Sequence, residues 1–389
     1  MADDSATTRA APHAEPPGLP TCGEQAGGPV ALGGRGWLAT ALIVAAVAFA
    51  APRLWERAET FDPGADYRIP HALSEDYWHF GRYARTAAGQ GRIAVLGDSV
   101  IWGQYVAPEM TLSGRLNALT GPGRFANLGL DGAHPAALAG LIERHAAPLR
   151  GGRVVLHLNA LWLATADRDL SGRQPIRFNH PRLVPQFVPY LRCYDASVSE
   201  RLGVAAWRAT PFRQWAGHLQ AAYFGNADLP WWTVEHPYDS PLAALQRGLP
   251  APAPLPADWP PPWVAGEEKA DFPWVDLGGS LQWRSFRQAV TVLRSRGNEV
   301  FVFLGPFNEH ILTAPSRRRY QAIQRGLVAW LAERGVPHLA PAPLPADLYA
   351  DASHPLGPGY AALARQLLAD EAFAAFAGAP LPEPTAARD

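Results

Sequence analysis

A short apolar run that ends at Gly-Asp-Ser constrains the fold of this chain more than any other feature. Residues 92–96 read Arg-Ile-Ala-Val-Leu, and Gly97-Asp98-Ser99 follows directly. A β-branched and aliphatic run of this length indicates a buried strand. In α/β sheets, ligands bind outside the carboxyl ends of the strands. A hydroxyl at such a strand end has a rigid support and faces a cleft, so Ser99 is the candidate nucleophile.

A serine nucleophile needs a base, a group that orients the base, and donors for the oxyanion that forms. Near the other end, the chain reads Asp351-Ala352-Ser353-His354-Pro355. On a tight turn, this spacing brings the Asp351 carboxylate to one imidazole nitrogen of His354, while the other nitrogen faces a partner. A triad is defined by geometry and not by chain order. We therefore expect Ser99, His354 and Asp351 to be the catalytic residues.

Four sequence blocks resemble those of the SGNH (GDSL) hydrolase superfamily, and they occur in the order found in that family. The resemblance covers about residues 90–165 and 285–370, and the first three blocks each follow an expected strand. The blocks are Gly97-Asp98-Ser99, Asn127-Leu128-Gly129-Leu130-Asp131-Gly132, Leu158-Asn159 and Asp351-Ala352-Ser353-His354.

The resemblance implies an oxyanion hole formed by the backbone N–H groups of Ser99 and Gly132 and by the side-chain amide of Asn159. The third block departs from the family pattern. It usually reads Gly-x-Asn-Asp, and here it reads His157-Leu158-Asn159-Ala160. The asparagine is kept, but the residues on either side of it differ.

Strand-like runs alternate with helix-like periods on both sides of a less regular middle segment. This order predicts an α/β fold, a three-layer α/β/α arrangement around a parallel, flavodoxin-like sheet with right-handed crossovers. A serine at position 316 is expected to cap the helix that begins at Arg317. The expected strands are 92–96, 124–128, 153–158, 299–304 and 336–339, and the expected helices are 74–88, 109–119, 135–147, 281–297, 317–334 and 359–376.

The pattern breaks between residues 165 and 280, which we interpret as an inserted cap over the cleft. Eight of the fourteen tryptophans fall in this region or at its edge. Residues 195–219 have helical spacing with a break at Pro211, and 249–263 form a proline-rich loop. Exposed aromatic side chains beside a cleft would suit sugar rings or acyl chains. The alternative is that the tryptophans only fill a small core.

A few polar residues are candidates for substrate binding. The strand 299–304 ends at Gly305-Pro306, so Asn308, Glu309 and His310 should lie on the same rim as Ser99. Asp98, beside the nucleophile, is a further candidate. The alternative is that Asn308, Glu309 and His310 are ordinary polar residues of a loop.

An uncharged segment, Trp37 to Ala51, lies between Arg35 and Arg53. We interpret residues 36–55 as a transmembrane anchor, because a span needs roughly 17 to 25 residues. A cleaved signal peptide is the second interpretation, since Ala48-Phe49-Ala50 resembles a cleavage site. A buried core helix is the third. Residues 1–35 are expected to be a disordered tail, 56–90 a connector, 91–378 the hydrolase-like domain and 379–389 a flexible tail.

Composition excludes several classes of function. The net charge is −1 and no basic stripe is present, which argues against nucleic acid as a partner. The two cysteines, Cys22 and Cys193, are not expected to form a disulfide. No metal-ligand spacing occurs, so neither a metal nor a cofactor is expected.

The expected activity is ester hydrolysis or O-acyl transfer, with an acylated glycan or another ester as substrate. By analogy with anchored members of the family, we expect a single-pass inner-membrane protein with an extracytoplasmic, periplasmic catalytic domain. A transferase of this kind would work beside a membrane acyl-donor protein. Two alternatives are a non-catalytic glycan-binding or assembly subunit that kept the fold, and a lipid esterase.

Overall fold

The computed structural model describes residues 33–245, 248–250, 262–263 and 269–378. Most of the N-terminal tail, the C-terminal tail and most of the proline-rich loop expected from the sequence lie outside these residues, as does Cys22. The chain divides into two compact units, one ending at Val47 and the other beginning at Ala48.

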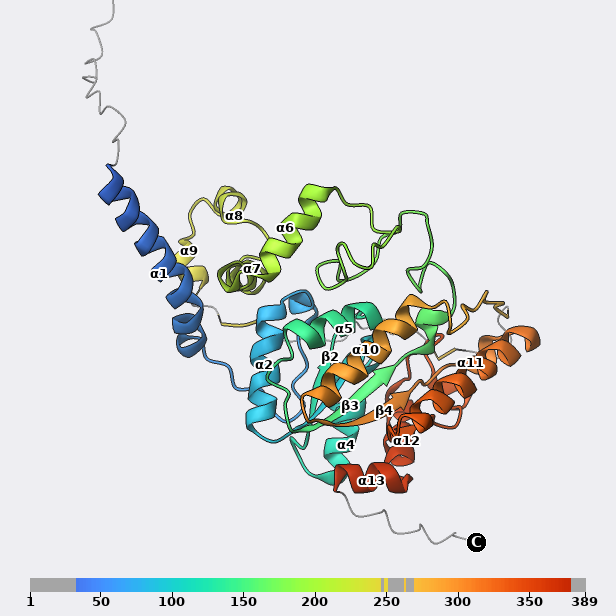
Figure 1. Cartoon of the computed structure of the whole chain (residues 1–389). Coiled ribbons are helices and arrows are strands. Elements are labelled where there is room, and N and C mark those ends of the chain that lie inside the picture. The colour runs from blue at the N-terminus through green and yellow to red at the C-terminus, as the bar shows by residue number, and fades with distance from the viewer. Residues whose placement is uncertain (1–32, 246–247, 251–261, 264–268, 379–389) are drawn as a thin grey trace, which may run out of the picture. The chain divides into compact units, whose positions relative to one another are not determined.

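The second unit is built on a parallel sheet of five strands in the order β2-β1-β3-β4-β5 (Figure 1). All strand pairs are parallel, which confirms the α/β class and the parallel sheet. The chain reverses direction across the sheet between β1 and β3, and such a switch point is where doubly wound sheets bind ligands. The strands are β1 (Ile93–Gly97), β2 (Phe125–Gly129), β3 (Arg153–Leu158), β4 (Glu299–Leu304) and β5 (His338–Leu339).

Thirteen α-helices accompany the sheet in the described part of the chain. They are α1 (Gly34–Ala58), α2 (Tyr77–Gly89), α3 (Ser99–Trp102), α4 (Leu112–Thr120), α5 (Pro135–Arg144), α6 (Val198–Arg208), α7 (Pro211–Tyr223), α8 (Leu229–Glu235), α9 (Pro241–Ala244), α10 (Leu281–Ser295), α11 (Ala314–Glu333), α12 (Gly357–Ala369) and α13 (Glu371–Ala377).

Alternate residues of β1 pack into two separate apolar clusters. Ala94 and Leu96 join residues of α2, α5 and α10, whereas Ile93 and Val95 join residues of α4, α12 and α13. Strands buried on both sides read as continuous apolar runs, and this is why the strands could be found from the sequence. The sheet is therefore a rigid support for the loops at its carboxyl edge.

Each predicted helix differs from the observed one at one end or both, and capping side chains explain two of the differences. The helix expected to start at Arg317 behind a Ser316 cap begins three residues earlier, because Thr313 accepts the hydrogen bond from the Ser316 N–H and a proline occupies the first turn. The Ser316 hydroxyl is buried and instead accepts from the Trp274 indole at 2.9 Å. The expected helix 359–376 is two helices, because the Asp370 side chain caps the second one.

The insertion contains helices α6 to α9. The break expected at Pro211 is present, since α6 ends at Arg208 and α7 begins at the proline. Its described tryptophans differ in exposure. Trp232 and Trp263 are buried, Trp207 and Trp215 are half-buried, and Trp231 is exposed. Filling a small core therefore explains only some of them.

Helix α1 (Gly34–Ala58) is long and apolar enough to cross a membrane, with a mean hydropathy of 1.8 over its most apolar window. Only 6% of that window is buried within the described protein, which disfavours the core-helix interpretation. Residues from Ala48 onward belong to the second unit.

Candidate active site

Ser99 lies at the first position of α3, directly after β1. Asp98 caps this short helix, because its Oδ1 accepts a hydrogen bond from the Val100 N–H at 3.0 Å. The turn also requires Gly97, since a Cβ there would lie 2.4 Å from the Ile101 side chain and 2.8 Å from that of His157. Ser99 is 6% exposed, so its hydroxyl is held in a nearly closed environment.

His354, from the C-terminal part of the chain, forms a hydrogen bond with this hydroxyl. His354 Nε2 lies 2.8 Å from Ser99 Oγ, and His354 Nδ1 lies 2.7 Å from Asp351 Oδ2. The turn that carries them closes on itself, because Asp351 Oδ1 accepts from the backbone N–H groups of Ser353 and His354, both at 2.9 Å. The structure thus brings the three residues expected to be catalytic into one hydrogen-bonded chain.

Within this hydrogen-bonded series, the Asp351 carboxylate favours the protonated form of the His354 imidazole. Burial lowers the pKa of His354, but the hydrogen bond and charge of Asp351 outweigh it, so the pKa is raised above its usual value. Burial would raise the pKa of Asp351, and the hydrogen bond from His354 reverses this shift. Tyr105 adds a contact, with its hydroxyl 3.4 Å from Asp351 Oδ2. An imidazole in this setting can accept a proton and keep its orientation.

Gly132 lies in the turn that follows β2. Its φ is 69°, in the left-handed region that favours glycine. A Cβ at this position would lie 1.9 Å from the side-chain nitrogen of Asn179, which comes from the insertion. Both the backbone angle and this close approach therefore exclude a larger residue.

Asn159, which follows β3, is joined through Asp98 to the loop that carries Ser99. Its Nδ2 donates to Asp98 Oδ2 at 3.0 Å, and its Oδ1 accepts from the Leu161 N–H. The Trp162 indole donates to the same Asp98 oxygen at 2.8 Å.

Asp98 itself is a positioning residue in this arrangement. Burial would raise its pKa, but the charge of His157, whose Nδ1 lies 3.3 Å from Oδ1, and the hydrogen bonds lower it to about 2. Both carboxylate oxygens accept from protein donors, which are the Val100 N–H, the Asn159 amide and the Trp162 indole. A role for Asp98 in substrate binding stays a prediction.

The other residues expected to bind substrate have structural contacts. Asn308 is fully buried, and its Nδ2 donates to the backbone oxygen of Asp351 at 3.2 Å. The Glu309 carboxylate accepts from Gln321, and His310 Nε2 lies 3.0 Å from the Leu344 oxygen. Asn308 therefore supports the loop that carries Asp351, and the other two hold neighbouring segments.

Three residues near the site could not be assigned from the sequence in advance. Trp162 follows Asn159 by three positions in a 3-10 turn, η3 (Ala160–Leu163), and this spacing was the only local signal. Asn179 and Tyr105 reach the site through contacts between distant segments, and sequence spacing gives no sign of them.

A cavity of about 570 Å³ adjoins Asn179. Its walls include the aromatic rings of Phe178 and Tyr194, which contact each other edge to face with centroids 5.4 Å apart. Arg177 adds a positive charge, and Glu75 and Asp195 add negative charges. Aromatic walls with a few polar groups are typical of small-molecule sites.

Within the described residues, no group of three His, Cys, Asp or Glu side chains is arranged to hold a metal ion. Cys193 is buried and forms no disulfide with any residue that the structure describes. No protein-family model matches the chain, and no curated protein matches its sequence significantly. The arrangement of side chains is therefore the basis for assigning a function.

Proposed function

We propose that this chain is a serine esterase or O-acyltransferase of the SGNH type, with the three-layer fold of that family. One observation carries the proposal. Ser99, His354 and Asp351 form a continuous hydrogen-bonded chain with the geometry of a nucleophile, a base and an orienting carboxylate.

In the proposed reaction, Ser99 Oγ attacks an ester carbonyl while His354 Nε2 takes the hydroxyl proton. The imidazolium that forms is stabilised by Asp351 and then protonates the leaving alcohol. The product is an acyl-enzyme on Ser99. Water, or a second alcohol, then attacks that acyl group with His354 acting as base again.

The oxyanion is proposed to accept from the backbone N–H groups of Ser99 and Gly132 and from Asn159. An amide carries two side-chain N–H bonds, and one of those in Asn159 is directed to Asp98. The second is the proposed donor to the oxyanion. Loss of one such donor costs roughly 3 to 4 kcal/mol of barrier.

The proposed substrate is a cell-surface or exported glycan that carries a small acyl group such as acetyl. The cavity beside Asn179 supports binding of a small molecule, because its lining combines aromatic side chains with a few polar and charged groups. Helix α1 supports a membrane-anchored location. The extracytoplasmic side is proposed for the catalytic domain by analogy with anchored members of the family. A membrane acyl-donor protein is the proposed partner if transfer is the reaction.

A fluorophosphonate probe tests the proposal, because only an activated serine reacts with it. The wild-type chain and a Ser295→Ala control, which alters an exposed helical serine, should be labelled equally. Ser99→Ala should lose the label. Labelling of Ser99→Ala at the wild-type level would reject the proposal. For a labelled enzyme, incubation of an acyl ester with and without a glycan acceptor separates transfer from hydrolysis.

A further inference from the structure

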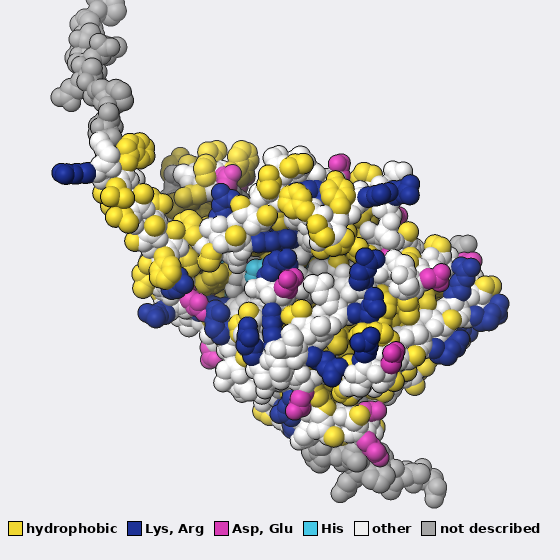
Figure 2. Space-filling view, viewed as in Figure 1, with side chains coloured by type: hydrophobic (Ala, Val, Ile, Leu, Met, Phe, Trp, Pro, Cys, Tyr) yellow, Lys and Arg dark blue, Asp and Glu magenta, His cyan; other side chains and the backbone are white. Residues whose placement is uncertain are grey.

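An exposed apolar surface lies on the insertion, far from the catalytic chemistry in sequence. We call it the α8–α9 patch. Trp231 is 59% exposed, Val234 71% and Tyr238 100%. Hydrophobic side chains gather at the surface near α8 in Figure 2. The patch consists of Leu229, Trp231, Val234, Tyr238 and Leu242.

The composition of the patch fits a lipid interface. Tryptophan and tyrosine are enriched where membranes meet water, because each has an apolar body and a polar tip. The segment 228–245 contains acidic residues at Asp228, Glu235 and Asp239 but no lysine or arginine. Any contact with a membrane would therefore depend on apolar insertion and not on attraction to anionic lipids.

The insertion is attached to the last turn of α1. Trp55 packs edge to face on Trp215 and Tyr223 of α7, with ring centroids 6.3 Å and 5.8 Å apart. Arg53 is the first charge after the apolar segment, and Glu59 lies six positions beyond it. At 1.5 Å per residue these two are separated by roughly 9 Å. The headgroup layer on each side of the hydrocarbon core is roughly 5 to 8 Å thick, so with Arg53 at the edge of the core Glu59 would lie just outside this layer.

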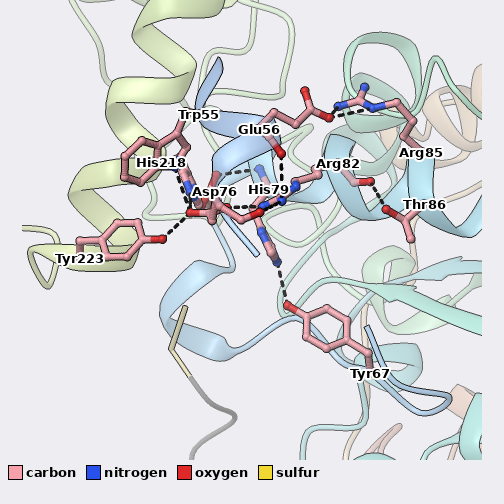
Figure 3. Close-up of polar contacts among 11 residues, drawn as sticks. Trp55, Glu56, Tyr67, Asp76, His79, Arg82, Arg85, Thr86, His218 and Tyr223 are labelled. Carbon is pink, nitrogen blue, oxygen red and sulfur yellow. Dashed lines mark hydrogen bonds and ion pairs between the residues drawn. The ribbon is translucent and has the colours of Figure 1, made fainter. Parts of the chain in front are cut away.

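Buried charges make the attachment firm (Figure 3). His218 of α7 lies between two carboxylates, with Nδ1 2.6 Å from Asp76 and Nε2 2.9 Å from Glu59. Glu59 also pairs with Arg82 of α2 and accepts from the Tyr223 hydroxyl. Removing one partner from such a buried set leaves an uncompensated charge, so the segments are held together strongly.

Packing continues from α7 to the patch. Phe224, at the end of α7, contacts Trp232 of α8 edge to face at 5.3 Å, and Trp232 stacks on His236 at 4.5 Å. Trp232 is buried, whereas Trp231 and Val234 lie three positions apart on a face of α8 that is exposed. The patch is thus fixed, through α7, to the point where α1 leaves its apolar stretch.

We propose that the α8–α9 patch inserts into the interfacial layer of the membrane that α1 crosses. This inference rests on the proposed membrane anchor. It gives the insertion a second function beside that of a cap, which is to hold the catalytic unit against the membrane surface in a fixed orientation.

Depth measurement by spin labelling tests the proposal in the full chain, reconstituted in phosphatidylcholine nanodiscs. Cys22→Ser removes the other thiol, and Cys193 is buried. A label at Val234→Cys is compared with one at Phe49→Cys in α1 and one at Leu119→Cys, a residue that is 54% exposed on α4. The readout is collision with oxygen, which partitions into lipid, relative to collision with a water-soluble nickel complex.

The proposal predicts an oxygen-to-nickel ratio at position 234 several-fold above that at position 119. Adding phosphatidylglycerol should not increase it, since the segment has no basic residue. A ratio at 234 equal to that at 119, with a lipid-like value at 49, would overturn the proposal and leave the anchor standing. A water-like value at 49 would overturn the anchor and the patch together. Dipolar broadening between labels at 234 would reassign the patch to contact between two copies.

Discussion

His354 Nε2 lies 2.8 Å from Ser99 Oγ, although 255 positions separate the two residues. The sheet accounts for this contact. Ser99 follows β1, and the turn that carries His354 follows β5 and is supported by Asn308 after β4. Because all five strands are parallel, their carboxyl ends meet at one edge of the sheet.

The pH dependence of turnover should follow His354. In the proposed mechanism the neutral imidazole is the base, and its pKa is raised above 6.5 because Asp351 outweighs burial. We expect kcat/KM for a short-chain nitrophenyl ester to rise with pH, with a midpoint above 6.5. In Asp351→Asn the midpoint should fall to lower pH and the plateau should drop about 10⁴-fold. An unchanged midpoint in this variant would show that Asp351 does not raise the pKa of His354.

Gly132→Ala should reduce kcat about 10² to 10³-fold, the effect of losing one oxyanion donor. The added methyl would meet the Asn179 side chain and displace the turn. Gly151→Ala is the matched control, because Gly151 has a similar positive φ of 63° but no atom within 4 Å of a Cβ. Partial recovery of kcat in the double variant Gly132→Ala, Asn179→Ala would identify the clash with Asn179 as the cause of the loss. Equal losses of kcat in Gly132→Ala and Gly151→Ala would exclude that cause.

Trp162→Phe should destabilise the protein by about 1.5 to 3 kcal/mol, the range for a hydrogen bond to a charged group. The Asp98 carboxylate loses the indole N–H at 2.8 Å and is left buried with fewer donors. Urea unfolding measures the change. Trp215→Phe is the control, because the buried indole nitrogen of Trp215 has no hydrogen-bond partner among the described residues. A loss for Trp162→Phe no greater than that for the control would argue against the Asp98 network.

Stability should fall as pH rises from 6.5 to about 9. Burial lowers the pKa of His218, but Asp76 and Glu59 raise it to about 9 in the folded protein. The unfolded value is about 6.5. A raised folded pKa stabilises the protein fully below the unfolded pKa, and this stabilisation is lost as pH passes through the folded pKa. Thermal unfolding against pH measures the slope, which His218→Gln should flatten. A wild-type curve that is flat between these pH values would refute the charged state of His218.

Much of the fold could be predicted from sequence because it depends on local patterns. β3 and β4 have the predicted bounds, since buried apolar runs end there at residues that differ sharply from strand residues. Helix ends were harder to predict. Threonine and serine are both common capping residue types, so Thr313 and Ser316 were both possible caps in the sequence. Only the proline between them, in the first turn, favours Thr313.

The candidate site divides in the same way. Ser99, Asn159 and the Asp351–His354 turn follow strands, so their approach could be expected from a parallel sheet. The inward direction of Asp98 and the contact between Gly132 and Asn179 could not be expected. Both depend on side chains that come from separate loops, and their positions are set by packing and not by spacing in the sequence.

The most direct test of the central claim is to find where an acyl group is placed on the enzyme. The purified chain is exposed briefly to nitrophenyl acetate, quenched in acid and mapped by peptide mass spectrometry. The account predicts one acetyl group on Ser99 in the wild type and its loss in His354→Ala. Acetylation at another residue, or equal acetylation of Ser99 in both proteins, would contradict it.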